Sequence, residues 1–235
     1  MCMKKMFLSV LLLLVLALIS GNINAQIIIK VGAGYGAGTQ KMLLESVFSG
    51  SSNKNIYESF GGNLGLFLAG GYEINQYVDF ELDLGYQHGR TEAIDLGILG
   101  SKTYVGRLVH IGPSLVFKTS VNEDITPYGK LGVFTGIPLT KVLVFGSEKK
   151  FKGGLPFGYN GALGLDYNFG DTFKLFAEVY HQSMIYKPTR RKELDGTVVK
   201  LKDDIDIPTP SNQELSHHFF SFGALGLNLG VKIVL

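Results

Sequence analysis

Carboxylates recur at every second position in one stretch of the chain, at Asp79, Glu81 and Asp83. In a β-strand, this spacing places all three side chains on one face. Other alternating stretches carry two more acids, three lysines and a histidine on the equivalent face, namely Asp166, Glu178, Lys30, Lys130, Lys232 and His110. If that face is buried, the charges must pair, because an unpaired buried charge is costly. The set predicts either a structural ion-pair network or a polar path for protons and small ions.

A second pattern combines a potential base with a potential nucleophile. His181 and Ser183 are two residues apart, so on a strand both would face the same side. The pair resembles the His-x-Ser of the lipid A deacylase family, although Met184 follows where that family usually has asparagine. The orienting acid would be Glu193 or Glu214, and only if a long loop folds back. We therefore predict that the protein is not an enzyme and keep a deacylase-like hydrolase as a minor alternative.

The elements that would position these residues are eight stretches in which apolar residues alternate with small or polar ones. In the last stretch, six apolar residues occupy every second position from Leu225 to Leu235. This period of two is typical of a strand with one apolar face. The stretches are 27–37, 60–74, 77–90, 103–117, about 128–137, 155–169, 173–183 and 224–235, and the fifth is shorter and less regular. Most are long enough for a tilted strand to cross a bilayer, which takes about 9–11 residues.

The links between the stretches are alternately short and long. The links after the second, fourth and sixth stretches are tight, whereas those after the first, third, fifth and seventh span about 38–58, 91–102, 139–154 and 187–214. Short periplasmic turns and long outer loops are typical of bacterial outer-membrane barrels. The sequence therefore predicts an all-β fold, an eight-stranded antiparallel up-and-down transmembrane β-barrel over residues 26–235. Such a narrow barrel is filled by its own side chains.

With this strand and loop rhythm, the chain resembles the small OmpA/OmpX-type outer-membrane β-barrel family from Ile27 to Leu235. The resemblance implies a monomer in contact with outer-membrane lipids. It also implies that the last strand is read by the barrel-insertion machinery, although such strands commonly end in an aromatic residue and this one ends in Leu235.

The first 25 residues have the features of a secretory signal peptide. Lys4 and Lys5 precede an apolar run over 7–19, and Ala25 is a suitable cleavage residue, so the mature chain would begin at Gln26 in the periplasm. Cys2 would leave with this leader.

Without the two leader lysines, 20 basic residues balance 20 acidic ones, which gives no indication of nucleic-acid binding. No motif indicates a metal or another cofactor.

Aromatic and basic residues fall at one height on the predicted lipid-facing side, where hydrocarbon meets the outer headgroups. They are His88, Arg107, Tyr159 and His181. Arg107 is suited to bind a lipid phosphate.

In the last outer loop, Asp195-Gly196 predicts a hairpin within a ribbon that continues the last two strands. The main prediction is a structural or surface-interaction role through outer loops that contact an extracellular partner. A narrow porin-like channel is the alternative.

Overall fold

The computed structural model describes residues 26–49, 52–95, 100–119, 124–144, 147–170, 172–201 and 219–235. The predicted signal peptide lies outside the described residues. The described part of the chain contains no helix of the length and apolar character needed to cross a membrane.

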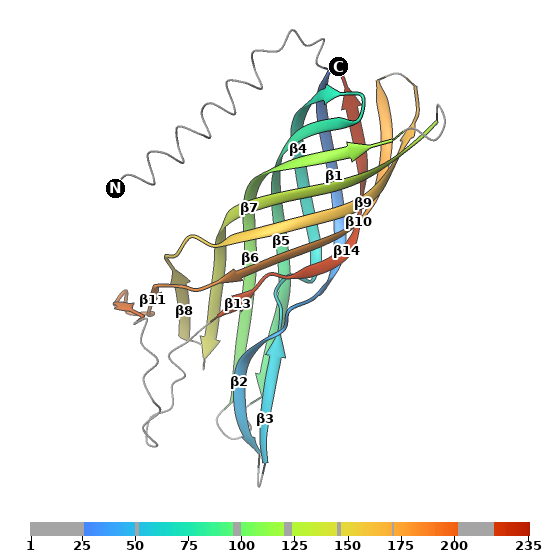
Figure 1. Ribbon diagram of the computed structural model, residues 1–235. Coiled ribbons are helices and arrows are strands. Elements are labelled where there is room, and N and C mark those ends of the chain that lie inside the picture. The colour runs from blue at the N-terminus through green and yellow to red at the C-terminus, as the bar shows by residue number, and fades with distance from the viewer. Residues whose placement is uncertain are drawn as a thin grey trace.

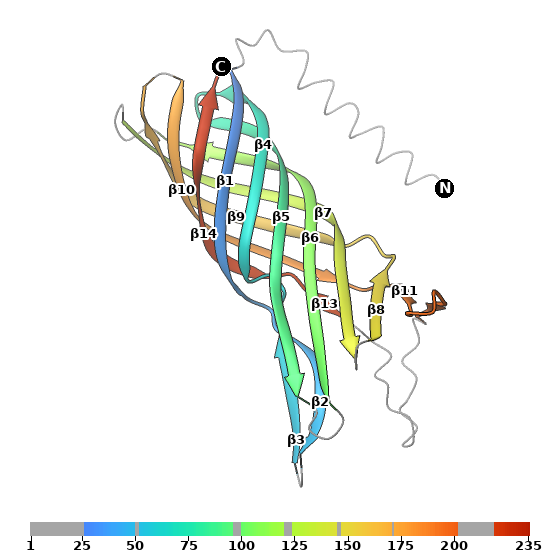
Figure 2. The same cartoon turned by 180° about the vertical axis from the view of Figure 1, so that it is seen from behind.

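Eight long strands form a closed antiparallel barrel (Figures 1 and 2), which confirms the predicted fold. They are β1 (Ile27–Gly38), β4 (Asn63–Asn75), β5 (Val78–Asp95), β6 (Ser101–Lys118), β7 (Ile125–Val144), β9 (Phe157–Asn168), β10 (Phe173–Tyr186) and β14 (Ala224–Val234). Each strand pairs with the next, and the pairing of β14 with β1 closes the ring. Closure pairs each of the eight strands with a neighbour on both sides over most of the wall, as a membrane requires.

The period-two pattern decides which side chains face out. In β14, Leu225, Leu227 and Leu229 are exposed, and Leu229 retains 64% of its surface. Lys232, on the other face of the same strand, is buried. The same division holds in β5, where Leu82 and Leu84 point outward. The wall therefore carries an exposed apolar belt, and the polar residues are enclosed.

Several predicted strand boundaries were wrong: β5 runs to Asp95 rather than to residue 90, and β10 to Tyr186 rather than to residue 183. Two further differences have a clear cause. The fifth strand, predicted to be short, is β7, which has 20 residues. Its glycines and prolines weaken the alternation in the sequence, but pairing with β6 on one side and with β9 and β8 on the other supplies its hydrogen bonds. The second strand begins at Asn63 rather than at residue 60, because residues 59–62 turn into the barrel. Asn63 marks this turn with a φ of 101°.

Several short strands lie at the end of the barrel away from the C-terminus, which we call the loop end (Figure 1). A hairpin of β2 (Met42–Ser49) and β3 (Ser52–Glu58) forms a sheet of its own. β8 (Ser147–Lys152) extends the wall beside β7, and β11 (Arg190–Lys192) and β12 (Val198–Lys200) follow it in the same sheet. The two-residue β13 (Phe220–Ser221) pairs with β10.

The predicted hairpin at Asp195-Gly196 is confirmed, but its setting was predicted wrongly. Asp195 accepts hydrogen bonds of 2.8 Å from both the backbone N–H and the hydroxyl of Thr197, and these bonds lower its pKa. Gly196 has a φ of 89°, which favours glycine. The hairpin strands β11 and β12 do not continue the last two barrel strands; β11 pairs with β8 instead. The reason is that β10 ends at Tyr186, and Pro188 follows.

Candidate functional site

The lumen holds a chain of buried ion pairs centred on Glu81 and Lys130. The Lys130 ammonium lies 2.9 Å from a Glu81 carboxylate oxygen and 2.5 Å from an Asp83 oxygen. Lys30, from β1, approaches Glu81 at 3.5 Å and Glu178 at 3.8 Å. All five side chains are buried. Alternation on β1, β5, β7 and β10 thus brings residues from four strands together.

A second group of charges extends this series of ion pairs toward the end of the barrel that carries the C-terminus. Lys232 lies 3.0 Å from Asp166 and 3.4 Å from Asp79. Lys118 approaches Asp79 at 2.7 Å and Glu73 at 2.8 Å. The sequence analysis did not include Lys118 and Glu73 among the lumen charges. Their signal was present, because Glu73 lies near the end of the stretch 60–74 and Lys118 directly follows the stretch 103–117, each in step with the inward face.

Neutral donors and aromatic rings complete the network. Tyr128 and Asn228 each donate a hydrogen bond of 2.8 Å to Glu178, and Ser114 donates one of 2.5 Å to Asp83. The Lys30 ammonium also lies 4.9 Å from the ring centroid of Tyr128 and 4.7 Å from that of Phe176. Charges taken out of water are tolerated when such contacts satisfy them. The network therefore fills the lumen with paired groups.

His110 faces the lumen beside this network without joining it. Its ring packs against Phe134 with 5.1 Å between centroids, and its Nδ1 atom has no hydrogen-bond partner among the described residues. It lines a cavity of about 70 Å³ together with Asp83, Lys130 and Glu178. That volume suits a few water molecules. In the described residues, no group of three potential ligands is placed to hold a metal ion.

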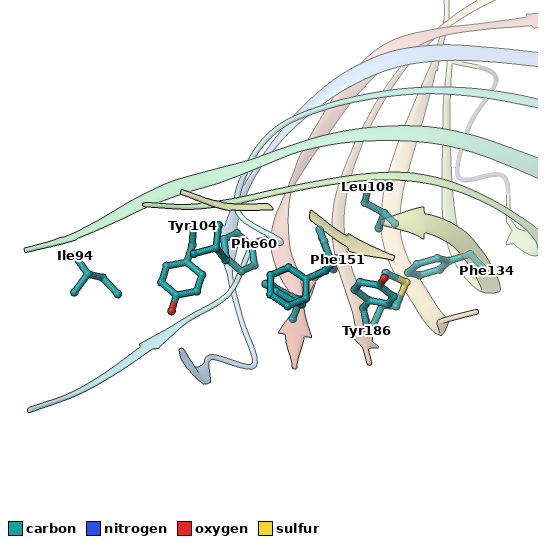
Figure 3. Close-up of a cluster of buried hydrophobic side chains, with 11 residues drawn as sticks. Phe60, Ile94, Tyr104, Leu108, Phe134, Phe151 and Tyr186 are labelled. Atoms are coloured by element: carbon teal, nitrogen blue, oxygen red, sulfur yellow. The ribbon is translucent and has the colours of Figure 1, made fainter. Parts of the chain in front are cut away.

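Toward the loop end, a polar layer gives way to an apolar one. Gln182 donates a hydrogen bond of 2.8 Å to Gln87, and Gln87 donates to the carbonyl of Gly61. Beyond this layer lies a cluster of eleven buried side chains, which we call the mouth cluster (Figure 3). Its members are Phe60, Ile94, Tyr104, Leu108, Phe134, Val142, Phe151, Met184, Tyr186, Phe220 and Phe222. The sequence analysis missed this cluster.

The mouth cluster forms because two chain segments bend into the barrel. The Phe60 N–H donates to Ser221 at 2.8 Å, and the Ser59 hydroxyl donates to the Gly223 carbonyl at 2.9 Å. A Cβ on Gly61 would collide with the Gly223 carbonyl oxygen, so this close approach requires glycine. The two segments thereby bring the rings of Phe60 and Phe222 to a centroid distance of 6.1 Å.

The four predicted interface residues form two pairs on different parts of the wall. His88 and Arg107 are cross-strand partners on β5 and β6, and the Nδ1 atom of His88 lies 3.3 Å from the Tyr86 hydroxyl. The rings of Tyr159 and His181, on β9 and β10, have centroids 6.1 Å apart. β7 lies between the two pairs.

The geometry at His181 and Ser183 does not assemble a nucleophile and base. The Ser183 hydroxyl is buried and donates its hydrogen bond to the Gln40 side chain at 2.7 Å, not to His181. Of the two possible acids, Glu193 accepts a hydrogen bond of 2.6 Å from Arg191, and Glu214 lies outside the described residues. The arrangement gives no support to the hydrolase alternative.

Comparisons with known proteins agree with this architecture. The family model described as outer membrane protein beta-barrel domain matches residues 10–232. A major outer membrane protein from Thermus thermophilus has a similar structure, with 11% identity, coverage of 91% of this chain and 100% of that one, and a TM-score of 0.56. Neisserial surface protein A is 14% identical, with coverage of 90% of this chain and 99% of that one and a TM-score of 0.46. No curated protein sequence matches the chain.

Proposed function

The chain belongs to the outer membrane protein beta-barrel domain family, and from this premise we propose that it is a closed barrel that holds an interacting surface outside the cell. In this proposal the leader exports the chain to the periplasm, and β14 is read by the barrel-insertion machinery. The loop end then faces outward. The observation that carries the proposal is the double closure of the lumen by the charge network and the mouth cluster.

Two barriers of different chemistry lie in series along the lumen. An ion that entered from the periplasmic side would have to displace Lys118 from Asp79, where they are 2.7 Å apart, and then pass the Lys130 pairs. Beyond these pairs it would meet the mouth cluster, whose members are apolar apart from the hydroxyls of Tyr104 and Tyr186 and therefore offer little to replace its hydration. Motion of one barrier alone leaves the other in place. This favours a closed barrel over a porin-like channel.

The loop end offers a surface suited to contacts with a protein partner. β12 is exposed along its whole length, and in the described part of the chain it pairs only with β11. Its other edge therefore presents backbone N–H and C=O groups that no other described strand pairs with. An exposed edge of this kind can accept a further strand from another protein.

Planar-bilayer recordings of the refolded protein test the closed state. We expect no single-channel steps from the wild type, and none from a Phe60→Ala, Phe222→Ala double variant, because the charge network still blocks the lumen. Heat-modifiable mobility on electrophoresis would show that both proteins are folded. Steady conductance from the wild type, with an ion selectivity that changes in Asp83→Asn, would establish the channel alternative instead.

Replacing residues 190–200 with a short Gly-Ser linker tests the surface role. The barrel should still fold, because this segment pairs only with β8 outside the closed ring. Cells that display the variant should bind less to immobilised extracellular proteins than cells that display the wild type. Unchanged binding would remove β11 and β12 from the interaction surface.

A further inference from the structure

Basic residues face one another across the sheet formed by β8, β11 and β12. Lys150 is the cross-strand partner of Lys192, and Lys152 is the partner of Arg190. Arg190 is in turn the partner of Lys200. Cross-strand partners share a face of the sheet, so all five point to the same side. We call these residues the basic face, and all of them are exposed.

Little on this side of the sheet neutralises the basic face. Glu148 lies 2.9 Å from Lys141 and 3.2 Å from Lys150, and hydrogen bonds from these two lysines lower its pKa. No ion pair joins Lys152, Arg190, Lys192 or Lys200 to another described residue. Like charges placed directly opposite each other destabilise a sheet. Among the described residues, the five bases of the basic face are therefore accompanied by one acid, and this excess of positive charge suits an anionic ligand.

A pocket of about 640 Å³ opens beside the basic face. β7 pairs with β9 as far as Thr135 and with β8 from Thr140 onward. Within the described chain, residues 136–139 have no partner strand on that edge. The pocket lies at this break, and Phe151 and Tyr186 of the mouth cluster are among the residues that line it.

The lining of the pocket combines apolar and basic side chains. Ile137 and Leu155 are 67% and 65% exposed, and Leu139 is also exposed. Four basic residues line the same pocket, namely Arg107, Lys141, Lys150 and Lys152. The apolar residues of β7 continue the exposed belt through Val133 and Leu131. A ligand here would meet hydrocarbon-compatible side chains on the barrel side and cations on the loop side.

We propose that this pocket and the basic face together bind one phosphorylated lipid of the outer leaflet. Its phosphate groups contact Lys150, Lys152 and Arg190, and an acyl chain lies along Ile137, Leu139 and Leu155. The guanidinium of Arg190 can bind a phosphate through two hydrogen bonds. A soluble polyanion would satisfy the charges but would leave the apolar half of the pocket uncovered, which favours a lipid.

Native mass spectrometry of the refolded full barrel in neutral detergent tests the proposal. The probes are diphosphorylated lipid A, its dephosphorylated form, and a heparin fragment as a soluble polyanion. We expect one diphosphorylated lipid bound per barrel and at least tenfold weaker binding of the dephosphorylated lipid. Equal binding of the two lipids would overturn the proposal.

Three variants separate the contributions. Lys150→Gln with Lys152→Gln should weaken lipid binding roughly fivefold for each lost charge. Lys149→Gln removes one positive charge from the opposite face of β8 and should have little effect. Leu139→Asn with Leu155→Asn should weaken binding of the lipid but not of heparin.

Two results would contradict this proposal once electrophoresis has shown that the variants fold. A loss of about fivefold in Lys149→Gln would mean that only total charge matters. Heparin binding that exceeds lipid binding, with no effect of the Leu139 and Leu155 changes, would identify a soluble polyanion site.

Discussion

Lysines occur in two regions of this protein in opposite settings. In the lumen, Lys130 lies within 2.9 Å of two carboxylates and is buried. On the basic face, Lys150 is directly opposite Lys192, and both are exposed. Acids of the same chain supply the counter-charges in the first region, whereas in the second most of the bases have no ion pair with another described residue.

The difference follows from the cost of desolvation. A buried cation without a partner would lose several kcal/mol of hydration, so the chain must place acids around it. An exposed cation keeps its water, and repulsion between exposed charges is weak at physiological ionic strength. A row of unpaired cations can therefore persist only at the surface. Three substitutions test this contrast. Each removes or adds one positive charge, and the effect on stability should depend strongly on where that charge lies.

The largest effect is expected for Lys130→Met. The change leaves Asp83 without its cation and leaves Glu81 with Lys30 alone, at 3.5 Å. Removing one partner of a buried pair typically costs about 3–5 kcal/mol. Urea titration of the refolded protein in lipid vesicles would measure the free energy of unfolding. Adding Asp83→Asn and Glu81→Gln should recover part of the loss, and a loss below about 1 kcal/mol would mean that the network contributes little.

An intermediate effect is expected for Leu229→Arg. This places a cation on the exposed apolar belt, which the membrane hydrocarbon would cover. Arginine at the middle of a barrel wall costs about 2–4 kcal/mol. The same urea titration would detect the change, with Leu229→Ala as the control for lost apolar contact. Equal losses in the two variants would mean that this position does not face lipid.

The smallest effect is expected for Lys192→Met. This residue is exposed and has no ion pair with another described residue, so the free energy of unfolding should change by less than about 0.5 kcal/mol. Relief of its repulsion with Lys150 would make the change slightly stabilising. A loss of more than about 1 kcal/mol would show that the basic face supports the fold and is not reserved for a ligand.

The barrel and its inward charges could be predicted because both follow from alternation within single strands. Asp79, Glu81 and Asp83 cannot face lipid, and the opposite apolar face fixes their direction without any knowledge of the neighbouring strands. Their individual partners could not be predicted. The approach of Lys30 to Glu81 depends on the stagger of strands around the ring, which the sequence does not state.

The mouth cluster and the basic face were missed because they arise from segments far apart in the chain. Phe60 fits its place because Gly89 and Gly106 leave room, and a Cβ on Gly106 would collide with the Phe60 ring. Glycines on the inward face of a strand were therefore the available signal for a bulky partner. The basic face depends on β11, a strand of three residues, which carries no periodic pattern of its own.

The break in pairing along β7 also bears on motion. Within the described residues, strand pairing joins β8, β11 and β12 to the barrel sheet through residues 140–144 of β7. Their amide hydrogens should exchange with solvent through local opening, whereas those of the closed ring should exchange only on much rarer and larger openings. The small sheet of β8, β11 and β12 would then unfold and refold locally while the closed ring of eight strands stays folded.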